Sequence, residues 1–441
     1  MDLSDRTEQY CGLTLIRRPP PAARKVTLPM TTDREIALAH IAPAMEVAFP
    51  LEEYRARLNR VRRAMAARGI DTLFVSAPEN IFYLSGMQAE WYQTNGPRSW
   101  QPASGIAVHV DADDYIHFER EHETALVKYS TVSRDVRIPG HEQRWGLMGF
   151  IVNELKGQGW LGGKVGLEMS AYRPDRATSE EFQALLEVEG ARVVDAGGLI
   201  EEVRRIKSPL ERAYTRTAAR IGDIGMKAAI DTLRPGVTEL DVYGEIVAAM
   251  AHAGGENPGI TMPVNSGAKS TASHGLASRK KILPGEVVHI DICGVFHRYH
   301  SNLSRTLCLG EPSRAVIERV ALSAGSFDVL AGLLRPGIPM ASVFAEMTRY
   351  YKEQGIWDEQ RWIGGYELGI AFPPDWVGPS YWDVNMDLGD RCFDAGMVGN
   401  YESQFFLPQG AGASVLIDTM LFDETTADLL HQVPREILIC G

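Results

Sequence analysis

Two polar side chains eleven residues apart, Asp291 and Asn302, mark the part of this sequence with the clearest potential for chemistry. The spacing has the layout of a site for two divalent cations, in which Asp291 would be the first carboxylate ligand. A second carboxylate would stand at position 302, where this chain carries an amide. Because a neutral amide is a weak ligand for a hard cation, the pair raises the question of whether such a pocket works without metal.

Two predicted strands would position these side chains. Apolar and polar residues alternate around Asp291, and a period of two places His289 and Asp291 on the same face of a strand. The following segment, 299–306, would place His300 and Asn302 together in the same way. If the two polar faces meet across a hairpin, they gather an acid, an amide and imidazoles in one pocket. The alternative is a polar face that is simply exposed to solvent.

An internal repeat organises the second half of the chain. The tetrapeptide Leu-Arg-Pro-Gly occurs at 233–236 and again 101 residues later, at 334–337. Each copy follows an apolar segment of helix length and precedes an amphipathic one, and similar residues continue in register. A unit repeated in this way predicts two α+β halves related by a pseudo-twofold axis. A cleft shared by two such halves is a natural place for a site.

The first half of the chain predicts a separate α/β domain. Residues 51–68 have the periodicity of an amphipathic helix, and short strand-like runs follow. These runs are 72–76, 81–84, 106–110, 115–118 and 165–168. Further on, Ser208-Pro-Leu-Glu211 has the pattern of a capping box with proline at the first helical position, so a long helix should begin there.

These patterns divide the chain into three predicted parts. They are an N-terminal extension over 1–48, an α/β domain over 49–205 and a C-terminal domain over 206–441. The extension is rich in proline and lacks sustained periodicity.

The composition is that of an ordinary globular protein, with 45% hydrophobic and 23% charged residues. A net charge of −12 disfavours binding to nucleic acids and to anionic membranes. The five cysteines are scattered and lack a CxxC spacing, which disfavours a disulfide framework or a zinc site. We see no apolar run long enough for a signal peptide or a membrane span. The sequence therefore predicts a reduced, cytoplasmic protein whose partner is a small molecule.

Over roughly residues 50–441 the chain resembles the creatinase, aminopeptidase P and prolidase family. His274, in Ala-Ser-His-Gly, precedes Asp291 by seventeen residues, which is the distance between the catalytic histidine and the first metal carboxylate in members that resemble aminopeptidase P. The family's peptidases use five metal ligands, two aspartates, a histidine and two glutamates. The matching positions here hold Asp291, Asn302, Tyr366, Glu402 and Ile417. Two of the five ligands remain, so the resemblance implies no metal and no other cofactor.

The chain is more similar still to metal-independent members of the ectoine hydrolase type. The shared segments are Tyr299–Thr306, Gly365–Trp376 with its Pro-Pro-Asp-Trp block, and Val433-Pro-Arg. Asp291 is a departure, since those members carry glutamate at its position. The resemblance implies an enzyme that hydrolyses a C–N bond other than a peptide bond, in a small polar or cyclic nitrogen compound. It also implies an α+β, two-domain creatinase/prolidase architecture whose C-terminal domain has the pita-bread fold.

The resemblance also implies roles for individual residues. The expected catalytic residues are His274, Asp291, Glu402 and Tyr366, with histidine acting as acid and base beside the carboxylates. The expected substrate contacts are His300, Asn302, Asp375, Trp376, Trp91 and Tyr92. The last two lie in the N-terminal domain, which in creatinase-like homodimers reaches the partner's active site, so a homodimer is expected as well.

Two other functions stay open at this point. One is a metallopeptidase of the Xaa-Pro class, and the other is a non-catalytic binding relative. Structural roles are also open for single residues: His274 could cap a turn, and Glu402 could pair with an arginine such as Arg305.

Overall fold

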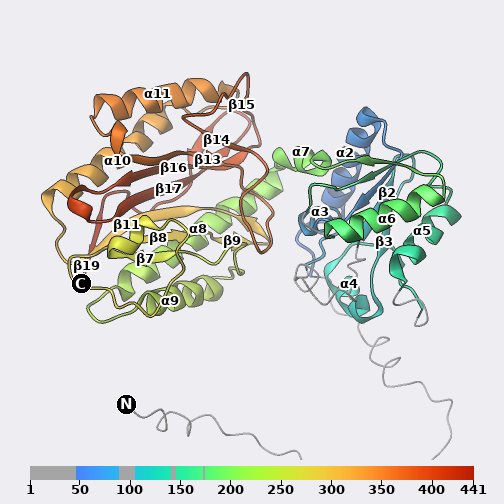
Figure 1. Ribbon diagram of the computed structural model, residues 1–441, viewed down its shortest axis with the longest axis horizontal. Helices are drawn as coiled ribbons and strands as arrows, with labels where there is room; N and C mark the ends of the chain where they lie inside the picture. Colours follow the sequence, from blue (N-terminus) through green and yellow to red (C-terminus); the bar gives the residue numbers. More distant parts are fainter. Residues whose placement is uncertain (1–45, 89–104, 141–145, 172–173) are drawn as a thin grey trace, which may run out of the picture. The chain divides into compact units, whose positions relative to one another are not determined.

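The computed structural model describes residues 46–88, 105–140, 146–171 and 174–441. They belong to a unit that spans Ala44–Gly441. Within the described residues this unit contains a six-stranded sheet and a nine-stranded sheet, each accompanied by helices (Figure 1).

The six-stranded sheet has the order β4-β3-β2-β1-β5-β6. Its elements are α2 (Leu51–Arg68), β1 (Thr72–Val75), α3 (Pro78–Ser85), β2 (Gly105–His109), β3 (Ile116–Phe118), α4 (Thr124–Ser130), β4 (Asp135–Arg137), α5 (Leu147–Gly157), β5 (Lys164–Leu167), α6 (Arg176–Val188), β6 (Arg192–Asp195) and α7 (Leu199–Arg205). Leu73 and Val75 of β1 pack in one apolar cluster with residues of α2 and α3. Phe74 packs in another with residues of α5 and α6. Helices therefore cover both faces of the sheet, which explains why its central strand β1 is buried throughout.

One predicted element of this domain is wrong. Residues 81–84, expected to be a strand, lie within helix α3. Pro78 occupies the first turn of this helix, where its missing N–H costs nothing, and Gly86 ends it with a left-handed backbone. A four-residue apolar run has no period long enough to distinguish a strand from a buried helix. The other strand-like runs and the helix over 51–68 are confirmed.

The nine-stranded sheet has the order β14-β13-β16-β17-β11-β8-β7, with β18 beside β17 and β19 beside β11. Its helices are α8 (Pro209–Thr232), α9 (Glu239–His252), α10 (Arg314–Leu333) and α11 (Met340–Glu353). Its strands are β7 (Val264–Ser266), β8 (Val287–Ile292), β11 (Leu303–Leu309), β13 (Gln360–Tyr366), β14 (Tyr381–Asp383), β16 (Val398–Phe406), β17 (Ala413–Phe422), β18 (Ala427–Leu429) and β19 (Leu438–Cys440). Two short ribbons accompany it, β9 (Val295–Phe296) with β10 (Tyr299–His300), and β12 (Ile338–Pro339) with β15 (Cys392–Phe393).

The predicted repeat is visible in this arrangement. Each Leu-Arg-Pro-Gly segment joins a long helix to one of 14 residues, α8 to α9 and α10 to α11. The strand order is symmetric about the β11–β17 pair, with β8 and β7 on one side and β16 and β13 on the other. Residues of α8 and α9 pack with β8, and residues of α10 and α11 pack with β16, as Figure 1 shows. The predicted capping box at Ser208 and Glu211 is present at the start of α8.

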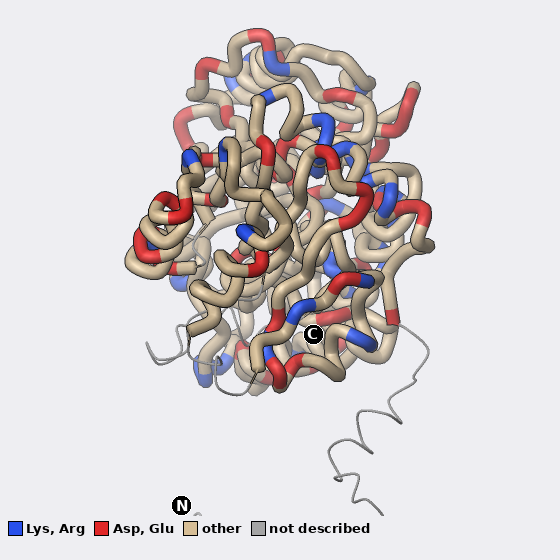
Figure 2. Tube along the Cα trace, turned by 90° about the vertical axis from the view of Figure 1, so that its right-hand side faces the viewer, with Lys and Arg blue, Asp and Glu red and all other residues tan. Residues whose placement is uncertain are grey.

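The predicted domain boundary at 205/206 falls just after α7, which ends at Arg205. This boundary and the boundary at residue 48 stay predictions. In the view of Figure 2, Lys and Arg positions are interspersed with Asp and Glu positions along the described trace. Among the described helices, none has the length and apolar character that crossing a lipid bilayer requires.

Candidate active site

A cavity of about 620 Å³ opens on the face of the nine-stranded sheet that the helices leave uncovered. Its lining includes six of the predicted site residues, which are His274, Asp291, Tyr366, Asp375, Trp376 and Glu402. They come from β8, β13, β16, the turn before β8 and the loop after β13. The fold therefore brings together side chains that are up to 128 residues apart, from His274 to Glu402.

Strand alternation explains which side chains reach this cavity. On β8, His289 and Asp291 line it, whereas Ile290 and Ile292 pack in the apolar cluster beneath α8 and α9. On β16, Glu402 lines the cavity from one face of the strand. Its neighbours of opposite parity, Tyr401 and Phe405, pack beneath α10 and α11. The predicted pocket on the polar face of β8 is present.

Asn302 lies beneath the cavity and binds the carboxylate of Asp291. Its Nδ2 donates to Oδ1 of Asp291 over 2.7 Å, and its Oδ1 accepts from Nδ2 of Asn400 over 2.7 Å. The hydroxyl of Tyr366 also donates to Oδ1 of Asn302 at 3.2 Å, and it accepts from Nε1 of Trp376 at 3.1 Å. The amide of Asn302 is thus fixed in one orientation, with its N–H group directed at Asp291.

Glu402 is held by two further amides. Nδ2 of Asn400 donates to its Oε1 at 3.0 Å, and Nε2 of Gln404 donates to its Oε2 at 2.6 Å. Asn400 therefore contacts both Asn302 and Glu402, so that a chain of side-chain amides connects the carboxylates of Asp291 and Glu402. No cation contributes to the described hydrogen bonds of either carboxylate.

Burial changes the protonation of this pair. Loss of solvent raises the pKa of Asp291 to about 7, against the smaller opposing effect of the Asn302 hydrogen bond. Burial, and then the neighbouring charge of Asp291, raise the pKa of Glu402 to about 8. The pocket therefore keeps part of its negative charge neutralised by protons near neutral pH. A cationic ligand would replace those protons as the counter-charge.

His274 lies in an exposed turn between β7 and β8 and lines the cavity. An imidazole at the mouth of a pocket that contains two carboxylates can exchange protons both with a ligand and with solvent.

One predicted substrate contact, His300, does not line the cavity. His300 is completely buried, with Nε2 accepting from the N–H of Gly259 at 3.0 Å and Nδ1 donating to the carbonyl of Arg298 at 2.9 Å. His300 belongs to the β9–β10 ribbon, and β11 begins only at Leu303. Residues 301–302 lie outside both strands, so the alternation expected to place His300 and Asn302 on one face is interrupted. Two further predicted contacts, Trp91 and Tyr92, lie outside the described residues.

Arg305 does not pair with Glu402. It contacts Asp418 at 3.3 Å and binds backbone carbonyls, with both side chains fully buried. The open alternative in which an arginine of this kind neutralises Glu402 is therefore wrong for Arg305.

The structure adds residues to the site that the sequence analysis did not name as catalytic residues or substrate contacts. Asn400 and Gln404 flank Glu402 at a spacing of two, and His289 lines the cavity beside Asp291. The signal for the first two was available, because 400, 402 and 404 form the polar set of an alternating strand. Trp362 lines the cavity from β13.

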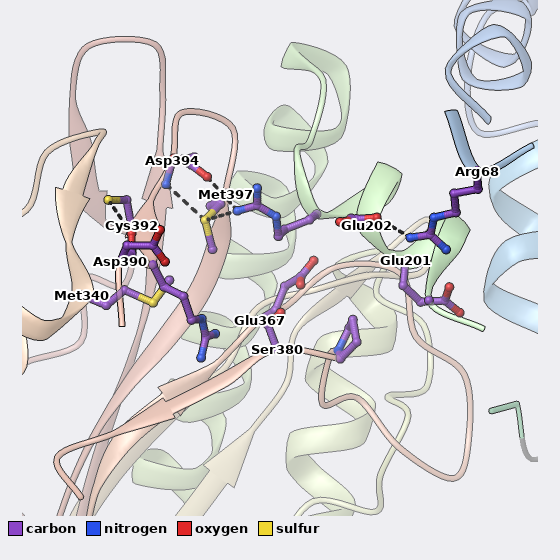
Figure 3. A pocket seen from close by; sticks show the side chains of 14 residues that line it. Arg68, Glu201, Glu202, Met340, Glu367, Ser380, Asp390, Cys392, Asp394 and Met397 are labelled. Atoms are coloured by element: carbon purple, nitrogen blue, oxygen red, sulfur yellow. Dashed lines mark hydrogen bonds and ion pairs between the residues drawn. The ribbon is translucent and has the colours of Figure 1, made fainter. Parts of the chain in front are cut away.

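A second pocket, of about 610 Å³, is lined by charged residues from both domains (Figure 3). Five of its eight charged lining residues form ion pairs: Arg68 with Glu202, Arg205 with Asp394 at 2.8 Å, and Glu367 with Lys207, which is outside the lining. Among the described residues that line it, none is a histidine. The first cavity is the better candidate for catalysis, because only there do an imidazole and carboxylates of raised pKa occur together.

Comparison with known families covers most of the chain. Residues 57–206 match the creatinase/prolidase N-terminal domain, and residues 213–424 match metallopeptidase family M24. Ectoine hydrolase from Halomonas elongata is 29% identical, over 90% of this chain and 99% of that protein. An uncharacterised hydrolase/peptidase, y4tM of Sinorhizobium fredii, is 30% identical over 74% of this chain and 83% of its own.

Solved structures agree on the fold. The prolidase from Pyrococcus horikoshii OT3 superposes with a TM-score of 0.71 at 21% identity. The match covers 87% of this chain and 100% of the prolidase chain. This confirms the predicted α+β architecture with an N-terminal domain and a pita-bread C-terminal domain.

The residues at the five metal-ligand positions do not fit a dinuclear centre. Asn302 directs a hydrogen-bond donor, not an oxygen, at Asp291, and its oxygen is already bound by Asn400 and Tyr366. Ile417 offers only hydrocarbon and is opposite Glu402 in the sheet. Over the described part of the chain, no three His, Cys, Asp or Glu side chains are grouped so that they could hold a metal ion.

Proposed function

Because this chain belongs to the creatinase/aminopeptidase P family of hydrolases, we propose that it hydrolyses a C–N bond in a small polar or cyclic nitrogen compound without a metal ion. The observation that carries the proposal is the hydrogen bond from Asn302 to Asp291. In that geometry an amide N–H occupies the space between the carboxylate and its neighbours, which is where a shared cation would have to lie. Ectoine hydrolase, among the relatives, supports a cyclic amidine as the substrate.

A cationic amidine would match the acidic part of the cavity. Asp291 and Glu402 both have a raised pKa because they are buried together. An amidinium ion between them would supply the missing positive charge, so substrate binding and carboxylate ionisation favour each other. The flanking Trp362 and Trp376 give the ring apolar walls.

The proposed reaction uses the protein's own side chains. Asp291, whose Oδ1 is fixed by Asn302, would use its other oxygen to attack the amidine carbon or to take a proton from water. If Asp291 takes a proton from water, the water oxygen forms the new C–O bond directly. If Asp291 attacks, the C–O bond forms to Asp291 first, and water then cleaves this covalent intermediate and frees the carboxylate. In both routes the C–N bond breaks, and the departing nitrogen needs a proton. His274 would transfer that proton. Asn302, which Tyr366 holds in place, keeps the carboxyl group of Asp291 oriented. We also propose that the protein forms a homodimer.

The test is a substrate screen combined with metal analysis of the purified protein. Ectoine, hydroxyectoine, creatine and Xaa-Pro dipeptides would be assayed with and without a chelator. We expect turnover of a non-peptide compound that chelation leaves unchanged, with metal far below one equivalent. Activity on Xaa-Pro dipeptides that disappears on chelation and returns with manganese would replace the proposal by a metallopeptidase.

A further inference from the structure

His289 is a buried histidine at the cavity wall whose polar atoms have no partners. It lies on β8 and lines the cavity on the same face as Asp291. The residue is 1% exposed, yet neither Nδ1 nor Nε2 makes a hydrogen bond within the protein. Buried polar atoms are rarely left unpaired, because the loss of water without a replacement bond costs free energy. A bound ligand with a hydrogen-bonding group at this part of the cavity would supply the missing partner.

The comparison with His300 sharpens this point. His300 is equally buried in the same domain, but backbone groups satisfy both of its ring nitrogens. Burial of an imidazole in this fold therefore does not by itself leave nitrogens unpaired. The difference is that His289 lines this cavity and His300 does not.

The charges around His289 are basic. Arg361 and His274 are the charged neighbours that, after burial, lower its pKa to about 3. Arg361 is at a register shift between β13 and β16, as at a β-bulge, a device that redirects a side chain. Its Nη2 donates to the carbonyl of Thr271 at 2.8 Å, beside the turn that carries His274, while Nη1 is buried without a partner.

The neighbouring part of the cavity is acidic. Asp291 raises the pKa of Glu402, and both carboxylates raise the pKa of Tyr366, with no basic group among the main causes for either residue. The cavity therefore has an acidic part around Asp291 and Glu402 and a basic part around His289. Residues two positions apart on a strand are separated by about 6–7 Å, so one small molecule is long enough to contact both parts.

We infer that His289 forms a subsite for the carboxylate of a small zwitterionic substrate, with Arg361 providing positive charge behind it. The imidazole N–H donates to the carboxylate, and the cationic nitrogen of the same molecule lies at Asp291 and Glu402. This deepens the proposed function, since it rests on the same cavity and restricts the substrate class to compounds with an acid group close to the scissile C–N unit.

A test that needs no substrate uses acetate as the carboxylate probe. The full-length wild-type protein and the His289→Leu variant would be melted in sodium acetate and in sodium chloride of equal ionic strength. We expect acetate to raise the melting temperature of the wild type by about 1–3 °C over chloride, and to leave His289→Leu unchanged. His289→Leu removes no hydrogen bond, so it should fold and melt no lower than the wild type. His300→Leu is the control, which should melt lower and keep the acetate effect.

A second measurement links the subsite to the substrate. Calorimetric binding of ectoine and of the same ring without its carboxylate would be compared in both proteins. We expect His289→Leu to weaken ectoine binding by about tenfold to a hundredfold and to change the other compound by less than about twofold. Equal weakening of both compounds would overturn the subsite.

The two proposals fail in different ways. If neither ring binds the wild type while acetate acts as expected, the cyclic substrate is wrong and the subsite stands. If acetate stabilises both proteins equally, it is an adventitious ion only. If it stabilises neither protein, His289 does not form a carboxylate subsite. Either result overturns the inference.

Discussion

Nδ2 of Asn302 donates to Oδ1 of Asp291 over 2.7 Å. The oxygen of the same amide accepts hydrogen bonds from Asn400 and Tyr366. A 180° flip of the amide group would therefore leave those two donors unpaired. A position that would supply a second carboxylate to a metal pair instead orients the first carboxylate. Under the proposed function, a cationic substrate would then take the place of a bound cation as the counter-charge of this carboxylate.

Asn302→Asp should damage both stability and activity. It would replace a donor by a second carboxylate against Asp291, and a hydrogen bond to a charged group is worth roughly 1.5–3 kcal/mol. We expect the free energy of unfolding to fall by about 2–4 kcal/mol at pH 8 and by less at pH 5, where protons relieve the repulsion. Loss of the fixed Asp291 geometry should lower kcat/KM roughly a hundredfold. Denaturant titrations and steady-state assays in chelator measure both.

Asn153→Asp, on the exposed surface of α5, is the matched control and should change neither quantity. Wild-type turnover by Asn302→Asp would mean that the amide has no part in the reaction.

His274→Ala should remove activity without removing structure. The side chain is exposed in a turn, so its truncation loses little packing, whereas a group that transfers a proton contributes about 10²–10⁴-fold to the rate. We expect kcat to fall within that range and the melting temperature to stay within about 1 °C. His252→Ala, at the exposed end of α9, should leave kcat unchanged. A drop in melting temperature without a specific loss of kcat would instead favour the turn-capping role.

The sequence predicted the C-terminal fold because the repeat and the strand alternation are long patterns. The two Leu-Arg-Pro-Gly segments mark equivalent helix pairs, and alternation on β8 correctly assigned Asp291 to the polar face. The strand expected at 81–84 failed because a short apolar run is compatible with either structure, and Pro78 decided for a helix.

The site was predictable only where its residues lie on continuous strands. His300 was misplaced because the chain leaves strand geometry between β10 and β11, a break that has no period to detect. The unpaired state of His289 was not predictable either, since hydrogen bonds depend on neighbours from distant segments. The register shift at Arg361 on β13 is a further feature that only the pairing with β16 reveals.

Glu211→Ala should destabilise the contact between helix α2 and the C-terminal domain. Its Oε1 accepts from the hydroxyl of Tyr299 at 2.7 Å and lies 3.3 Å from Nη2 of Arg57, and all three residues are fully buried. Removing the carboxylate leaves Arg57 with Glu53, at 3.0 Å, as its remaining counter-ion, so the loss is that of a hydrogen-bonded partner to a charged group, about 1.5–3 kcal/mol. Glu318→Ala breaks an exposed pair on α10 and should cost less than about 0.5 kcal/mol. Equal effects of the two substitutions, measured by urea titration, would contradict the role of burial.

Glu402→Gln should change how stability depends on pH. Burial raises the pKa of Glu402 to about 8, so the folded protein holds this proton more tightly than the unfolded chain does. The corresponding stability is fully present at pH values below the ordinary pKa of a glutamate, and it is lost as the pH rises through about 8. Each carboxyl group of this kind lowers the free energy of unfolding by up to about 1.4 kcal/mol per pH unit in that window.

An amide at position 402 does not titrate, so the variant escapes that loss. From pH 5 to pH 8, we expect the stability of Glu402→Gln relative to the wild type to improve by about 3–4 kcal/mol, whatever the difference at pH 5. Glu318→Gln, on the exposed face of α10, should show no such trend. A trend in the opposite direction would mean that Glu402 is ionised and stabilised in the empty pocket. A cation other than the substrate would then be needed beside it, and the metal-free reaction would lose its main electrostatic argument.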